Sequence, residues 1–89
     1  MMRKLKSMPY AQCHVIVDTN GTYLYSYTTK VVTLDNNGWL TVHGLHSMTT
    51  RKHISNFMRE YLSKSYALAK QLYNDEMMYN IFTGEVKNI

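Results

Sequence analysis

The sequence predicts an α+β fold: an antiparallel β-meander of three to four strands, then a long amphipathic helix and a short C-terminal element. Two observations support this prediction. Turn signals rich in Asp, Asn and Gly, at 18–21 and 35–38, separate segments in which polar and apolar residues alternate. After Gly44 the apolar residues recur every three or four positions instead, which is the period of a helix face. With 89 residues, the chain is expected to form a single domain, 1–89.

The first half of the chain is expected to hold a basic tail and the meander. Residues 1–8 are basic and show no clear period, so they predict a frayed tail. The meander is expected within 13–44, and connections as short as its turns join antiparallel strands. Whether 23–34 forms two strands or one long bent strand is open. Strands are expected over 14–17, 22–27, 30–34 and 39–43.

The helix is expected over 49–73, with Thr49 or Thr50 as its N-cap and a break near 63–65 as a variant. Two interpretations of its apolar stripe are open: it covers the sheet, or it forms a homodimer through the helix face. Within 74–89 we expect a short helix from Asn74 through Phe82, stopped by Gly84, with an edge strand that includes Met78 and Ile81 as the alternative. The stripe runs at steps of four and three residues through Ile54, Met58, Tyr61, Ser65, Leu68 and Leu72.

The composition is that of a folded protein, with 45% apolar and 18% charged residues. Cys13 is the single cysteine, so an internal disulfide is excluded and a reducing compartment is favoured. No apolar run approaches the roughly 18 residues of a membrane span. The basic start leads into Ser7 and Pro9 rather than into the apolar stretch of a signal peptide. We therefore expect an intracellular protein that does not contact membranes.

The formal charge of +4 is unevenly distributed. Residues 1–74 carry nine Lys or Arg against three acids, whereas 75–89 carry one Lys against three acids. No acid lies between Asp35 and Glu60. This middle region is expected to attract polyanions or an acidic protein surface. The alternative is a solvated basic face that only keeps the protein dispersed.

The start of the expected helix is the first candidate site. Free backbone N–H groups at a helix start attract anions, and hydroxyls and cations beside them strengthen such a site. The competing interpretation is plain capping, in which Ser47 or Thr49 satisfies the helix end and the cations are solvated. The residues of this candidate partner or anion site are Ser47, Thr49, Thr50, Arg51, Lys52 and Arg59.

An aromatic platform is the second candidate site. Tyr23, Tyr25 and Tyr27 alternate along one expected strand, and Trp39 lies on a neighbouring one. Such rings can stack on unpaired bases, and nearby Lys30 could neutralise phosphate. The alternative is that the tyrosine row packs against the helix as part of the core.

The sequence supports a metal site or a catalytic site less than it supports the two candidate sites above. Neither Ser47 with His53 nor Cys13 with His14 is accompanied by an oxyanion loop or an orienting acid. We therefore expect no metal, no cofactor and no enzymatic activity. A zinc site would need ligands that only folding brings together: His43, His46 and His53 with Cys13 or His14.

Two segments carry a family resemblance. A Ser-Tyr-x-Thr strand begins at Ser26, and a Ser-x-Thr-Thr-x-x-His-Ile-x-x-Phe segment runs from Ser47 to Phe57, with a hairpin between them. Together they make residues 25–60 similar to an uncharacterised group of small proteins encoded by bacteriophages and mobile elements of Gram-positive bacteria. The resemblance implies a short phage accessory protein that acts in the cytoplasm of its bacterial host.

Such accessory proteins act by binding, so the leading expectation is a non-catalytic protein that binds a host macromolecule. One example would be an inhibitor of a defence nuclease, as anti-CRISPR proteins are, with a host protein or ribonucleoprotein as partner. A net charge of +4 argues against mimicry of DNA by an acidic surface. An inhibitor of this composition would cover an acidic patch, grip guide RNA or wedge into a protein groove. The alternative is a direct nucleic-acid-binding module with a basic, aromatic surface.

Overall fold

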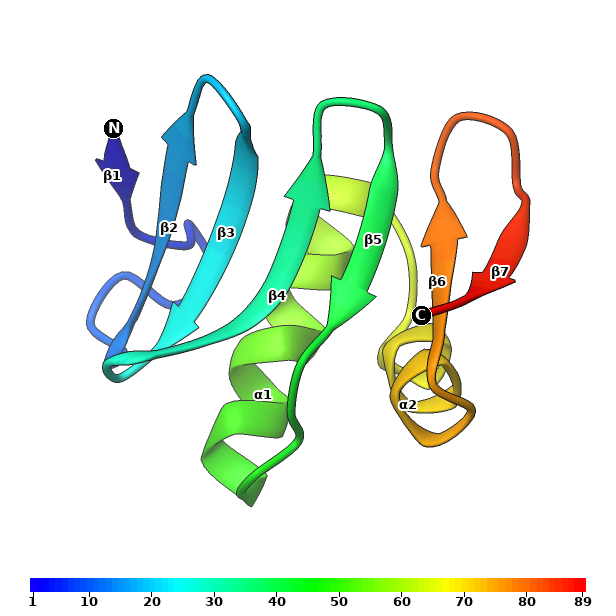
Figure 1. Cartoon of the computed structure of the whole chain (residues 1–89). Helices are drawn as coiled ribbons and strands as arrows, with labels where there is room; N and C mark the ends of the chain where they lie inside the picture. The colour runs from blue at the N-terminus through cyan, green and yellow to red at the C-terminus, as the bar shows by residue number, and fades with distance from the viewer.

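The computed structural model describes residues 1–89 and shows a seven-stranded antiparallel sheet with helices on one side (Figure 1). The strands follow one another in sequence order, from β1 at one edge to β7 at the other. No helix combines the length and apolar character needed to cross a membrane. The elements are β1 (Met2–Arg3), β2 (Cys13–Asp18), β3 (Gly21–Ser26), β4 (Thr29–Asp35), β5 (Trp39–Val42), α1 (Met48–Phe57), a π-helical turn (Met58–Leu62), α2 (Tyr66–Asn74), β6 (Met77–Asn80) and β7 (Val86–Asn88).

The expected fold was therefore wrong in its main proportions. Seven strands replace a meander of three to four, and two short helical segments replace one long helix over 49–73. The N-terminal strand was not expected, and the C-terminal strands were expected only as the alternative to a short helix; both extend the sheet.

Hairpin turns lie at both positions where the sequence predicts them, because an aspartate organises each turn. Asp18 Oδ1 accepts the backbone N–H groups of Asn20 (2.8 Å) and Gly21 (3.2 Å). Asp35 Oδ1 does the same for Asn37 (2.9 Å) and Trp39 (3.0 Å). These side-chain bonds fix the registers of β2 with β3 and of β4 with β5.

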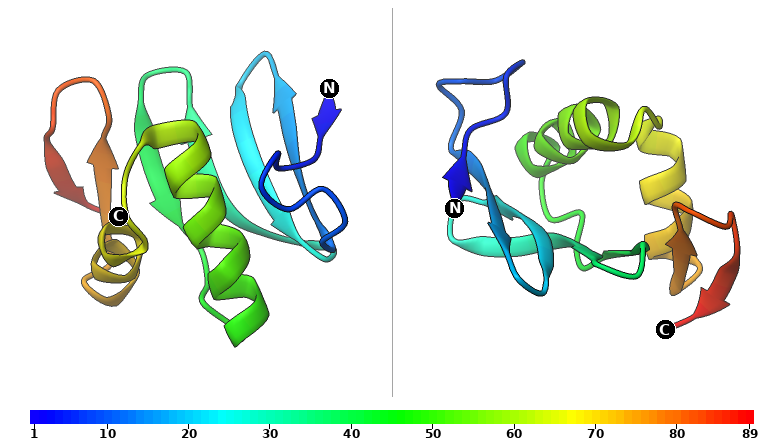
Figure 2. Two further views of the ribbon diagram at one scale, coloured as in Figure 1. Left: turned by 180° about the vertical axis from the view of Figure 1, so that it is seen from behind. Right: turned by 90° about the horizontal axis from the view of Figure 1, so that it is seen from above.

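The core lies between the sheet and the helices (Figure 2). Alternate residues of each strand point to this side, as the period of two requires, and meet one face of the helical layer. Each large side chain buried there contributes about 1.5–3 kcal/mol. The buried apolar residues are Leu5, Cys13, Val15, Leu24, Val31, Val32, Leu40, Val42, Ile54, Phe57, Met58, Ala69 and Leu72.

The helical layer is broken at Ser63. The π-helical turn that follows α1 ends there with φ 53°, a left-handed conformation that no helix continues through. Ser65 is extended before α2 begins, so an unbroken helix over 49–73 is wrong, and the variant with a break near 63–65 is confirmed. The predicted apolar stripe packs inside the chain: Ile54 and Leu72 are buried and Tyr61 lies against the core. A homodimer through that face stays a prediction.

Both ends of the chain differ from expectation. Residues 1–8 are not a tail, because β1 pairs with β2 and Leu5 is fully buried. Residues 74–89 do not form the helix we expected. They form the β6–β7 hairpin, in which Met77 and Tyr79 alternate onto the core side and extend the sheet beside β5. The chain follows the period of two at 77–80 and does not begin a helix at the capping signal of 74–76.

Candidate nucleic-acid interface

One side of the sheet carries no helix, and the aromatic residues of the strands gather on it. In the view from above in Figure 2, both helices lie on the same side of the sheet. We call the other side the open face. Register and alternation place these residues on it: His14, Ile16, Tyr23, Tyr25, Lys30, Thr33, Trp39, Thr41, His43, Met78 and Lys87.

Each aromatic ring of the open face has a basic or imidazole neighbour. The Tyr25 ring stacks on His14, with 5.2 Å between centroids and 3° between planes. The Lys30 ammonium lies 5.1 Å from the centroid of Tyr23. The Lys87 ammonium lies 4.1 Å from the centroid of Trp39. Rings and positive charge therefore alternate across the surface, which is the combination that single-stranded nucleic acid requires.

The spacing of the rings follows from strand geometry. Tyr23 and Tyr25 are two residues apart on β3, about 7 Å along the strand. Trp39 is two strands away on β5, about 10 Å across the sheet. Thr33 pairs with Tyr23 on one side and with Thr41 on the other, so two small side chains continue the row from Tyr23 to β5, and the three rings are half-buried.

Two titratable groups on the open face are held neutral. Burial, and then the charge of Lys30, lower the pKa of His43, whose Nε2 lies 2.7 Å from Thr33 Oγ1. Desolvation, and then the charge of Asp18, raise the pKa of the Tyr23 phenol. Both side chains are therefore uncharged near pH 7, and each can donate or accept a hydrogen bond.

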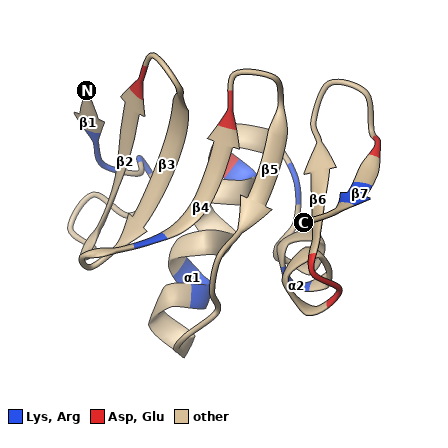
Figure 3. Cartoon of the chain, viewed as in Figure 1, with Lys and Arg blue, Asp and Glu red and all other residues tan.

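The carboxylates keep to the margins of the open face. Asp18 and Asp35 lie at the tips of the first two long hairpins in Figure 3. Both accept backbone N–H groups of their own turns. The middle of the open face, between Lys30 and Lys87, carries no acid. After desolvation, the charges of Asp18 and Asp35 help to raise the pKa of the Tyr23 phenol, so an anionic ligand would meet the least repulsion on the part of the open face away from these two hairpin tips.

Tyr27 does not belong to this platform, although the sequence placed it in the same row as Tyr23. It lies in the turn between β3 and β4 with φ 57°, and its exposed ring is 5.9 Å from the ring of His53 on the helix side. The alternation ends where the strand ends, at Ser26. The platform thus keeps three of the four rings expected from the sequence.

The start of α1 is a capped helix end. Ser47 is the N-cap, and its Oγ accepts the Thr50 backbone N–H at 3.1 Å. Thr50 is 4% exposed, and its hydroxyl faces the interior. Thr49, Arg51 and Lys52 point to solvent. Two of the hydroxyls assigned to an anion site are therefore occupied by capping and by the core.

Behind this cap lies a buried chain of polar groups. Thr50 Oγ1 is 2.9 Å from Ser26 Oγ, which is 2.8 Å from His53 Nδ1. Burial, and then the charge of Lys4, lower the pKa of His53, so its Nδ1 can accept from Ser26. Ser26 and His53 are 2% and 1% exposed, so no substrate reaches this Ser–His pair. The chain ties α1 to the end of β3.

Arg59 lies away from the helix start, in a shallow groove of about 360 Å³. Its Nη2 donates to Asn56 Oδ1 at 3.0 Å. Glu60 accepts the backbone N–H of Lys6 at 2.8 Å, so the groove fastens the N-terminal segment to the helical layer. A carboxylate at its centre makes this groove unsuitable for a polyanion. It is lined by Lys6, Ser7, Asn56, Arg59 and Glu60.

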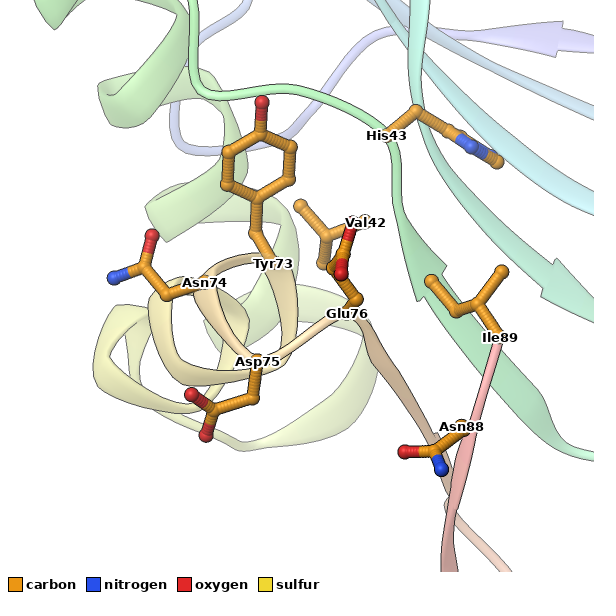
Figure 4. Close-up of a pocket in the computed structure, with 8 residues that line it drawn as sticks. All are labelled: Val42, His43, Tyr73, Asn74, Asp75, Glu76, Asn88 and Ile89. Atoms are coloured by element: carbon orange, nitrogen blue, oxygen red, sulfur yellow. The ribbon is translucent and has the colours of Figure 1, made fainter.

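The largest cavity, about 780 Å³, lies between the end of β5, the end of α2 and β7 (Figure 4). Most of its lining is exposed, and Asn74 and Asp75 point away from Val42. Its carboxylates, Asp75 and Glu76, would repel a polyanion. The lining residues are Val42, His43, Tyr73, Asn74, Asp75, Glu76, Asn88 and Ile89.

The candidate metal ligands do not converge. No group of three or more His, Cys, Asp or Glu side chains is placed to hold a metal ion. Cys13 is buried on the core side, where desolvation raises the pKa of its thiol. His14, the next residue, faces the other side and stacks on Tyr25.

The neighbours of two rings on the open face, Lys87 and His14, were missed by sequence reasoning. Lys87 was missed because no helix or strand was expected after Gly84. His14 was considered only as a partner of Cys13 and as a zinc ligand. Alternation along the 14–17 strand would have found His14, since it shares a face with Ile16 and not with Cys13.

Comparison with known proteins gives one match. No curated protein matches the chain, and no solved structure matches it. The model of a family of unknown function (DUF8033) matches residues 1–76, which include β1 to β5 and both helices. The chain therefore belongs to this family of unknown function.

Proposed function

We propose that the protein binds single-stranded nucleic acid on the open face of its sheet. The observation that carries the proposal is the placement of Tyr23, Tyr25 and Trp39 on a helix-free surface, each beside a cation or an imidazole. Unpaired bases would stack on the rings, and Lys30 and Lys87 would contact the phosphates.

An aromatic ring face should bind a stacked base more strongly than it binds a lysine ammonium. An exposed cation–π contact is worth about 0.5–1 kcal/mol. Stacking of a base on an aromatic side chain is worth about 1–3 kcal/mol. A base can therefore displace Lys30 from Tyr23, and the freed ammonium becomes available to a phosphate. Paired bases cannot stack in this way, so we expect single strands to bind better than duplexes.

The resemblance of residues 25–60 to phage-encoded proteins supports a second part of the proposal. We infer a phage or mobile-element origin and action in the cytoplasm of a bacterial host. Binding of a host protein or ribonucleoprotein through Arg51, Lys52 and Arg59, including inhibition of a defence nuclease, stays a prediction. Capping accounts for Ser47 without such a partner.

Titration with fluorescently labelled oligothymidine and with a duplex, each at low and at physiological salt, tests the proposal. Trp39 is the single tryptophan, so its fluorescence reports on base stacking directly. We expect tighter binding of the single strand, quenching of Trp39 and a steep salt dependence.

The matched variants are Tyr25→Ala on the open face and Tyr10→Ala on the N-terminal segment, where the side chain is 96% exposed. Loss of one stacked base should weaken binding about fivefold to a hundredfold in Tyr25→Ala. Tyr10→Ala should bind as the wild type does. Absence of oligothymidine binding at low salt, or equal weakening in both variants, would refute the proposal.

A further inference from the structure

Lys87 covers the Trp39 ring more closely than any other lysine covers a ring in this protein. Its ammonium is 4.1 Å from the ring centroid, against 5.1 Å for Lys30 over Tyr23 and 5.9 Å for Lys64 over Tyr79. Tryptophan is also the aromatic side chain that attracts cations most strongly. The ring face that a base would need is thus occupied in the free protein.

The contact comes from the far edge of the sheet. Lys87 lies on β7, which pairs with β6 and lies outside residues 1–76 matched by the family. β7 is exposed along its length and has no further strand beside it. The long, flexible stem of Lys87 can therefore swing away from Trp39 without disturbing the core.

We propose that Lys87 gates the Trp39 end of the open face, so that this end selects nucleotides by their phosphate and disfavours uncharged aromatic ligands. This inference rests on the function proposed above. Any ring that stacks on Trp39 must first displace the ammonium and lose its cation–π contact. A nucleotide restores that loss, because its phosphate gives the displaced ammonium a new partner. An uncharged base offers the ammonium only neutral acceptors, which bind it less strongly than a phosphate does.

Lys30 is a weaker candidate for the same role. It lies farther from its ring, at 5.1 Å, and it shares its surroundings with His43, whose pKa its charge helps to lower. Replacing Lys30 would therefore change the surroundings of both Tyr23 and His43. Lys87 offers the cleaner measurement, since Trp39 reports its own occupancy by fluorescence.

The experiment compares two probes, oligothymidine and its uncharged methylphosphonate analogue of the same length. In Lys87→Ala, binding of the charged probe should weaken, and the slope of its logarithmic salt dependence should fall by about one. Binding of the uncharged probe should tighten about twofold to fivefold, because the competing ammonium is gone. The ratio of the two affinities measures the selection directly.

The matched control is Lys64→Ala, which removes a lysine from a ring on the helix-covered side of the sheet. It should leave both affinities unchanged. Lys87→Gln keeps most of the stem and removes the charge, so it should repeat the loss of binding to the charged probe even if the alanine variant is less stable.

Two results would overturn the inference while leaving the proposed function intact: an unchanged salt slope in both Lys87 variants, or equal changes in affinity for the two probes. A wild-type protein that binds neither probe at low salt would overturn the proposed function, and the gate with it.

Discussion

Replacing Thr50 with valine should destabilise the protein, whereas the same change at the neighbouring Thr49 should not. The two threonines are adjacent in the first turn of α1, so they differ in environment rather than in helix position. Thr50 is buried, and its hydroxyl lies 2.9 Å from Ser26 Oγ; Thr49 is exposed. Valine keeps the volume and the branched shape of threonine, so each substitution removes little more than a hydroxyl.

The expected loss follows from the partners of Thr50. A hydrogen bond between neutral groups contributes about 0.5–1.5 kcal/mol net. The second contact, from Ser47 Oγ at 3.3 Å, is long and adds little. Thr50→Val should therefore cost about 1 kcal/mol, which lowers the Tm of a domain this size by about 4–8 °C. Ser26→Ala should cost more, about 1–3 kcal/mol, because it leaves His53 Nδ1 unpaired inside the protein and leaves the Thr50 hydroxyl with only its long contact to Ser47.

Urea and thermal unfolding of four proteins test this reasoning: the wild type, both single variants at Ser26 and Thr50, and their combination. If the polar chain acts as one unit, the double variant should lose less than the two single losses together, by about 0.5 kcal/mol or more. Equal stability of Thr50→Val and Thr49→Val would refute the reasoning. It would mean that the buried hydroxyls contribute nothing net to the attachment of α1 to β3.

Three further predictions concern stability. Burial lowers the pKa of His53 below 6.5 in the folded state. The unfolded chain therefore binds more protons than the folded protein, so the free energy of unfolding should be constant above pH 6.5 and fall as the pH drops below it. Urea unfolding across this pH range checks the prediction. The free energy of unfolding of His53→Gln should depend less on pH. Leu5→Ala should cost about 2–5 kcal/mol in urea unfolding, and a negligible loss would mean that the N-terminal segment is a dispensable tail. Gly38→Ala should lower the Tm more than Gly84→Ala, because both glycines have positive φ but only at Gly38 would a Cβ come within 2.5 Å of the Phe82 ring.

The hairpins could be predicted from the sequence because their signals are local. Asp18 and Asp35 accept backbone N–H groups within four residues of themselves, and such bonds form regardless of the rest of the fold. The break of the helix was predicted only as a variant near 63–65, where the structure confirms it. Apolar residues continue at helical spacing on both sides of Ser63, so the pattern does not show that the chain turns there. The last hairpin was missed because four alternating residues, 77–80, carry too little pattern to outweigh a capping signal.

The aromatic site could be predicted only in part, because alternation shows which residues share a face but not which face the helices cover. Tyr23 and Tyr25 form one row of β3, and Leu24 and Ser26 form the other. Either row could have met the helical layer. The position of α1, which depends on contacts far along the chain, assigned the tyrosines to the open face. Lys87 lies even farther along the chain, and no local sequence pattern indicates that it contacts Trp39.

The assignment of these two rows is the reverse of what burial alone would favour. A tyrosine removes far more apolar area from water than a serine does, yet Ser26 is 2% exposed while the Tyr25 ring lies on the open face. Ser26 has a structural reason for its place, since its hydroxyl joins Thr50 to His53. The aromatic rings have no structural reason of comparable strength for their place on the open face. Their neighbours are surface side chains such as Lys30, and each of these contacts contributes little free energy. Threonine would serve the strand equally well at these positions. The proposed binding of single-stranded nucleic acid would give these three aromatic residues a role that the fold itself does not give them.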